Sequence, residues 1–255
     1  MHIVSLGAGV QSTTMALMAA HGEIEPMPDA AIFADTQWEP RAVNRHLDSL
    51  TSPNVLPFPV HVVTAGSLRD KVMQEGYSDV PWHTSQGLGR RQCTKVFKLY
   101  PLRDKAKELC GVSHGRELSP SSIVMWIGIS TDEAARMKPS TVKYIENRWP
   151  LIEQRMSRGD CKEWMRRNEY LEPPRSACNV CPYKRDQEWR ATKNDLESWT
   201  DAVETDRAIR TLGSGNLEQY AHRSLKPLDE VDFSTAEDRG QLNMFDNECE
   251  GMCGV

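Results

Sequence analysis

The apolar residues of the chain gather in short runs, and several of these runs alternate with stretches of helical spacing. The first run, at 2–6, is followed by small residues and then by apolar positions up to Gly22, which predicts a strand, a turn and a helix. The second run, at 29–36, is apolar almost throughout, as is typical of a central parallel strand buried on both faces. Further strands are predicted at 60–64, at 122–130 and within 143–156, and further helices at 40–50, at 67–76, from 157 onward and at 195–212.

The turn between the first strand and the first helix has the features of an anion site. A strand that turns directly into a helix leaves backbone N–H groups and the positive end of the helix dipole at one point, which suits a phosphate. Gly7 and Gly9 let an anion approach the backbone, and the hydroxyls of Ser5, Ser12 and Thr13 add donors. Neither the Walker loop nor G-x-G-x-x-G fits this stretch. An ordinary strand-turn-helix with glycines for packing stays open as an alternative.

Asp35 ends the second predicted strand and is a further candidate for this site. In open α/β sheets, ligands gather at the carboxyl ends of the strands, so Asp35 is expected near the ligand of the loop. The alternative is that Asp35 caps the helix at 40–50, since Asp is a common helix cap.

Two basic stretches are candidates for holding phosphate or sulfate. The segment 89–107 carries seven Lys and Arg residues and one Asp, and part of it is expected to be a solvated helix face. Further along, Arg136 lies one helical turn past Asp132, so the two form either a surface ion pair or part of an anion site with Lys138. The residues of the first stretch that we expect to bind an anion are Arg90, Arg91, Lys95 and Lys98, which flank Cys93.

Four cysteines form a candidate metal site. Cys178 and Cys181 have the C-x-x-C spacing that lets two thiolates reach one metal, and Pro182 follows them. With Cys93 and Cys161 they make four thiolates, which suit either a structural zinc or a 4Fe-4S cluster. One knuckle with two solitary ligands favours the cluster over zinc. Alternatively, Cys93 and Cys161 are small buried apolar residues.

Cys249 and Cys253 lie in the last seven residues, where an exposed thiol invites a functional explanation. The nearby acids are expected to raise a thiol pKa and weaken the nucleophile, unless the basic residues around Arg90 bind the tail.

Composition limits the class of protein. The chain has 255 residues, is 39% hydrophobic and carries a net charge of −5. The stretch 228–255 holds eight acids and one base, so it contributes −7 and leaves +2 for the rest, which can receive an anionic substrate. No run reaches the roughly 18 apolar residues of a membrane span, and no signal peptide precedes the first strand. We therefore expect a soluble cytoplasmic protein without a disulfide framework.

Several segments resemble one known superfamily. GAGVQS at 7–12 resembles the SGGxDS loop of the PP-loop ATPases, with Gly9 and Ser12 matching and Gln11 standing where the pattern has Asp. FADTQWEP, RQCTKVFKLYPL and GISTDEAARM resemble segments of the phosphoadenylyl-sulfate (PAPS) reductase-like branch, in the expected order. The likeness extends over roughly the first 185 residues. By it, the chain is similar to the adenine nucleotide alpha hydrolase-like proteins.

The resemblance implies a doubly wound, mainly parallel sheet of about five strands with a Cys-containing C-terminal region. The ranges expected are 1–155 for the nucleotide-binding domain, 156–226 for a helical Cys-containing region and 227–255 for an acidic, partly disordered tail. The implied cofactors are ATP with Mg²⁺ and a 4Fe-4S cluster, with zinc as the alternative. The partners are an adenine nucleotide, a nucleobase or nucleic-acid acceptor, and a sulfur donor or thioredoxin-like reductant; a homodimer is left open.

The expected reaction is cleavage of ATP to AMP and pyrophosphate, with adenylation of a nucleobase or nucleic-acid group for sulfur or nitrogen transfer. One alternative is a sulfonucleotide reductase in which Cys249 attacks the substrate sulfur, and another is a nucleotide-binding module without catalysis. Asp35, Arg136 and Cys249 are the implied catalytic residues. The implied nucleotide-binding residues are Ser5, Gly7, Ala8, Gly9, Gln11, Ser12, Thr13, Asp35, Arg90, Arg91, Lys95 and Arg136, and the metal ligands are Cys93, Cys161, Cys178 and Cys181.

Overall fold

The computed structural model describes residues 1–77, 79–112, 118–212 and 217–234. The chain divides into two compact units: unit 1 consists of Met1–Ala65 and Val96–Ser176, and unit 2 of Gly66–Lys95 and Ala177–Gly254. The ranges 1–155, 156–226 and 227–255 expected from the sequence stay a prediction, and most of the last lies outside the described residues.

Unit 1 is built on a parallel sheet of five strands in the order β3-β2-β1-β6-β7. In the central register, Ile3 pairs with Ala30 on one side and with Met125 on the other. The α/β class and the five-stranded parallel sheet predicted from the sequence are confirmed. The strands are β1 (His2–Ser5), β2 (Ala30–Asp35), β3 (Val60–Thr64), β6 (Ile123–Ile127) and β7 (Ile145–Arg148).

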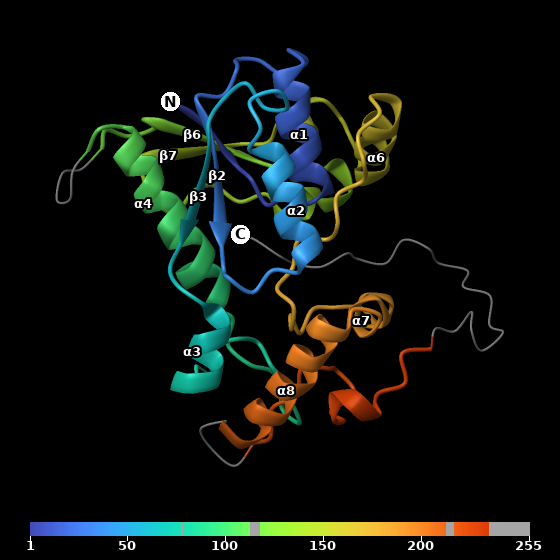
Figure 1. The fold of residues 1–255 in the computed structure, drawn as a ribbon. Coiled ribbons are helices and arrows are strands. Elements are labelled where there is room, and N and C mark those ends of the chain that lie inside the picture. The colour runs from blue at the N-terminus through green and yellow to red at the C-terminus, as the bar shows by residue number, and fades with distance from the viewer. Residues whose placement is uncertain (78, 113–117, 213–216, 235–255) are drawn as a thin grey trace. The chain divides into compact units, whose positions relative to one another are not determined.

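Helices cover both faces of this sheet (Figure 1). Neighbouring residues of a strand point to opposite faces. Val4 therefore packs with α1, α2 and α6, whereas Ile3 packs with α4. Both are fully buried, and burial of a side chain of this size contributes about 1.5–3 kcal/mol. The doubly wound arrangement is thereby confirmed. The helices of unit 1 are α1 (Val10–Ala20), α2 (Arg41–Leu50), α4 (Tyr100–Leu109), α5 (Pro150–Glu153) and α6 (Arg158–Arg167).

The ends of the helices follow from local chemistry. Helix α6 begins with a capping box, in which Ser157 accepts from the N–H of Asp160 and Asp160 accepts from the N–H of Ser157. Helix α2 begins after Pro40 without a side-chain cap. The Asp35 carboxylate instead accepts the N–H of Gln37 at 2.7 Å, so the alternative that Asp35 caps this helix is wrong.

Within its described residues, unit 2 has three α-helices, a short 3₁₀ helix at Leu228–Glu230 and a short hairpin. Arg69 on α3 forms ion pairs with Asp201 and Glu204 on α8. The buried Asp206 on α8 accepts from the N–H groups of Ala221 and Leu228 at 2.9 and 3.0 Å, and so holds that segment to the helix. The elements are α3 (Leu68–Glu75), β4 (His83–Thr84), β5 (Gly87–Leu88), α7 (Asp186–Lys193) and α8 (Leu196–Leu212).

In the described ranges, no helix combines the length and the apolar character needed to cross a membrane.

Candidate anion-binding site

The central strands β1 and β6 define where a ligand is expected on unit 1. From β1 the chain proceeds to β2 on one side, whereas from β6 it proceeds to β7 on the other side. In open α/β sheets, ligands bind in the crevice at the carboxyl ends of the strands where the order reverses in this way. The residues that follow these two ends are the loop before α1 and Gly128–Ser130.

The loop from Gly7 to Gly9 presents backbone N–H groups. Gly9 is the N-cap of α1 in an extended conformation, with no side-chain cap hydrogen bond and no acid in the first turn. Thr13 donates its N–H to the carbonyl of Gly9 at 3.0 Å, so the amides of 10–12 have no acceptor within the helix. Ala8 lies in the left-handed region, with φ of 54°, so the chain bends sharply between β1 and α1.

The Ser12 hydroxyl closes this loop. It accepts the N–H of Gly7 at 3.1 Å and donates to the carbonyl of Gly9 at 3.3 Å. The turn is therefore fixed before any ligand arrives, which reduces the entropic cost of binding.

A chain of four side chains runs beside the first turn of α1. Gln11 accepts from Arg158 at 3.1 Å and donates to Glu133 at 3.2 Å, and Glu133 pairs with Arg136 at 2.7 Å. Burial raises the pKa of Glu133, although the charge of Arg136 opposes this effect. Arg136 thus pairs with Glu133; the predicted partner, Asp132, accepts the backbone N–H of Arg158 instead.

Two further contacts lie at the carboxyl end of β2 and on α2. His46 on α2 shares a hydrogen bond of 3.0 Å with the Thr13 hydroxyl, and burial lowers the pKa of this imidazole. Glu39, whose side chain is fully buried, pairs with Lys98 at 3.1 Å and accepts from the Thr36 hydroxyl at 3.4 Å. The first contact orders an imidazole beside the first turn of α1, and the second orders the segment that follows β2.

The remaining predicted anion-binding residues lie in unit 2. Arg91 places its guanidinium 5.1 Å from the ring centre of Tyr183, while Arg90 and Lys95 are exposed. Their role in binding a nucleotide stays a prediction. Cys249 lies outside the described residues.

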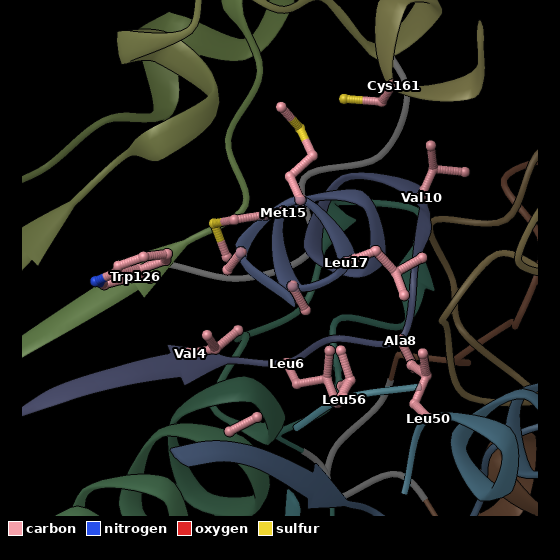
Figure 2. Close-up of a cluster of buried hydrophobic side chains, with 14 of the residues drawn as sticks. Val4, Leu6, Ala8, Val10, Met15, Leu17, Leu50, Leu56, Trp126 and Cys161 are labelled. Atoms are coloured by element: carbon pink, nitrogen blue, oxygen red, sulfur yellow. The ribbon is translucent and has the colours of Figure 1, made fainter. Parts of the chain in front are cut away.

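Cys161 is part of the hydrophobic core of unit 1. It lies on α6, fully buried against α1, in the same cluster as Val10 and Met15 (Figure 2). Burial raises the pKa of its thiol to about 12, and Asp132 adds to this effect. Full burial among apolar side chains is what the small-apolar alternative expects of Cys161.

Cys93, Cys178 and Cys181 belong to unit 2. The N–H of Cys181 donates to the carbonyl of Cys178 at 3.1 Å, which forms the tight turn expected of a C-x-x-C knuckle. Over the part of the chain that the structure describes, no three His, Cys, Asp or Glu side chains are grouped as a metal would require. The metal ligand set of Cys93, Cys161, Cys178 and Cys181 therefore stays a prediction.

The sequence did not single out several residues of the site. Arg158 stands within the capping box of α6, a pattern that predicts a helix start but gives no sign of Gln11 as its partner. His46 reaches Thr13 only because α2 packs beside α1.

Among the comparisons with known proteins, only the one with solved structures gives a match. No family model and no curated protein sequence matches the chain. Among solved structures, the chain is similar to the phosphoadenylyl-sulfate (PAPS) reductase from Candida auris in its phosphate complex. The TM-score is 0.46 at 13% sequence identity, over 68% of this chain and 74% of the other. The strand order β3-β2-β1-β6-β7 is that of an open, doubly wound α/β sheet.

Proposed function

We propose that the chain binds an adenine nucleotide at the loop 7–13 and splits ATP into AMP and pyrophosphate. The observation that carries this proposal is the geometry of the loop, in which uncapped amides and the kink at Ala8 converge at the switch point of the sheet. AMP is then transferred to a nucleobase or nucleic-acid group, and sulfur or nitrogen displaces it.

Each residue of unit 1 has a role in this proposal. The amides of 10–12 hold phosphate oxygens, the hydroxyl of Ser12 keeps the loop closed, and Arg136 neutralises the charge of the leaving pyrophosphate. Asp35, at the end of β2, contacts the nucleotide or its Mg²⁺. The magnesium ion, when bound, screens the phosphate oxygens and lowers the barrier to attack on the α-phosphate.

The free cysteines fit a reducing compartment, and three of them remain candidate ligands of a 4Fe-4S cluster. None of the five described cysteines forms a disulfide, which fits the cytoplasm. A 4Fe-4S cluster remains part of the proposal for Cys93, Cys178 and Cys181. Cys161 lies buried in the apolar core of unit 1, as the small-apolar alternative expects.

An assay of products tests the proposal. Anaerobically purified protein is incubated with ATP, Mg²⁺, a sulfide source and bulk tRNA or DNA, and AMP, pyrophosphate and sulfite are measured. The proposal expects AMP and pyrophosphate in equal amounts and no sulfite. Thioredoxin-dependent sulfite release from a sulfonucleotide, abolished by Cys249→Ser, would establish the reductase alternative. Nucleotide binding without any turnover would establish the binding module.

A further inference from the structure

Neither the sequence patterns nor the comparisons give Arg158 a role, although it lies near the loop. Its Nη1 lies 3.1 Å from the Oε1 atom of Gln11. Gln11 is the second residue of α1, so its side chain starts from the turn whose amides face the anion. The guanidinium is therefore bonded to a side chain that comes from the anion site itself.

The amide of Gln11 has a defined orientation. Its Nε2 donates to Glu133 at 3.2 Å and to Ser130 at 3.4 Å, while its Oε1 accepts from Arg158. A flipped amide would present its N–H₂ to a cation and its oxygen to a carboxylate, which is unfavourable on both sides. Gln11, at 8% exposure, thus fixes Arg158 in place.

The backbone of Arg158 is also fixed. Its N–H donates to Asp132 at 2.9 Å, and it is the first residue of α6, inside the capping box of Ser157 and Asp160. The Thr14 hydroxyl of α1 reaches the carbonyl of Cys161 on α6 at 3.4 Å, which joins the two helices. Arg158 is thereby preorganised on both its backbone and its side chain.

The neutral side chain at position 11 affects the net charge of the four hydrogen-bonded side chains beside the loop. Arg136 and Arg158 contribute two positive charges, Glu133 contributes one negative charge and Gln11 none, which leaves one positive charge. A carboxylate at position 11 would bring this sum to zero beside the helix N-terminus. The other nearby carboxylates bond elsewhere, Asp160 to Ser157 and Asp132 to the Arg158 backbone.

We propose that Arg158, aimed by Gln11, contacts the second of two adjacent phosphate groups of a nucleotide held at the loop, and so sets the preference of the site for a diphosphate over a monophosphate. This inference rests on the proposed function, since it assumes that the anion belongs to a nucleotide. The guanidinium is suited to this task because its donors bind two oxygens at once and it stays charged at any working pH.

The test compares variants by isothermal titration with ADP on the full chain. Arg158→Gln is expected to weaken ADP binding by at least about tenfold, the cost of one charge-assisted hydrogen bond. Gln11→Glu is expected to weaken binding by a similar factor, because its carboxylate neutralises Arg158 and repels Glu133. Arg166→Gln is the matched control, since Arg166 is exposed on the same helix and pairs with Glu163; it is expected to bind within about twofold of wild type.

A second readout separates ligand contact from a structural role. Wild-type protein is expected to bind ADP more tightly than AMP, and Arg158→Gln to lose most of that difference, whereas a merely distorted site would weaken both ligands equally. Arg158→Lys, which keeps the charge, is expected to recover part of it. If Arg158→Gln does not fold, Gln11→Glu decides by the same criteria.

The outcomes are distinct. ADP binding within twofold of wild type in Arg158→Gln and Gln11→Glu overturns this inference and leaves the proposed function standing. Equal weakening of AMP and ADP also overturns it. Absence of nucleotide binding by the wild-type chain overturns the proposed function, and the inference with it.

Discussion

Gly128, just after β6, lies against the backbone of Ser12 in the first turn of α1. A Cβ atom at Gly128 would come within 2.8 Å of the Ser12 nitrogen and 2.9 Å of its Cα atom. Because these are backbone atoms, the contact is not relieved by a side-chain rotation. The end of β6 therefore lies directly against the first turn of α1, and the loop 7–13 keeps its form partly because position 128 carries no side chain.

Gly128→Ala is accordingly expected to push the first turn of α1 away from β6. We expect a loss in the free energy of unfolding of about 1–3 kcal/mol, typical of overpacking, together with weaker nucleotide binding. Urea unfolding and calorimetric titration measure the two effects. Gly159→Ala is the control, since a Cβ there would meet nothing closer than the Ser157 hydroxyl at 3.5 Å. Equal behaviour of the two variants would show that the close contact has no consequence.

Cys161→Ala tests whether this cysteine is core or ligand. Removal of the buried sulfur is expected to cost roughly 1 kcal/mol in the free energy of unfolding, because it leaves a small cavity between α1 and α6. The iron and zinc content of the purified protein is expected to stay at the wild-type level. Cys178→Ala is the matched comparison in the C-x-x-C knuckle, and it is expected to lower any metal content found. Loss of metal in Cys161→Ala would restore the four-cysteine set.

Lys98→Met tests the ion pair at the fully buried Glu39 carboxylate. Removing the cation leaves a buried charge poorly compensated, which is expected to cost roughly 3 kcal/mol in the free energy of unfolding. The double variant Lys98→Met with Glu39→Gln is expected to recover part of this loss. Lys71→Met, which breaks the exposed pair with Glu75, serves as the control and is expected to change stability by less than about 0.5 kcal/mol. A cost for Lys98→Met no larger than that of the control would contradict the account.

His46 links the stability of unit 1 to pH. Burial lowers its pKa from the ordinary value of 6.5, so between the two pKa values the unfolded chain binds more protons than the folded one. The free energy of unfolding is therefore complete above pH 6.5 and falls as the pH is lowered toward the folded pKa. Burial lowers the pKa of three other imidazoles in the same way, those of His2, His61 and His83.

His46→Gln keeps a hydrogen-bonding partner for Thr13 but removes this proton. Urea unfolding at pH 7, 6 and 5.5 is expected to give a shallower pH dependence for the variant than for wild type, because the other titratable groups are unchanged. Identical slopes would exclude a role for His46 in the pH dependence.

The strands and helices of unit 1 were predictable because their patterns are strong and local. The apolar runs at 2–6, 29–36, 60–64 and 122–130 contain β1, β2, β3 and β6, and the Ser157–Asp160 spacing marks the start of α6. The hairpin of β4 and β5 was not predictable in this way, because its strands of two residues are too short to give a periodic pattern.

The contacts of the candidate site were only partly predictable. The loop 7–13 is visible in the sequence because neighbouring residues form it. Gln11 and Arg158, by contrast, are 147 positions apart, and their contact depends on the packing of α6 against α1. The same packing decides the environment of Cys161, which spacing alone left open between ligand and core. Ser130 and Glu133 have capping-box spacing, yet Glu133 is taken by Gln11 and Arg136.

The central claim is that the loop 7–13 captures the phosphates of a nucleotide, and amide NMR tests it most directly. Inorganic pyrophosphate is added to the isotope-labelled full chain, and the shifts of the backbone N–H signals are followed. The account predicts that the largest saturable shifts fall on residues 9–12, with smaller ones at the Gln11 and Arg158 side chains. Shifts that are absent from this loop, or that fall mainly on other parts of the chain, would contradict it.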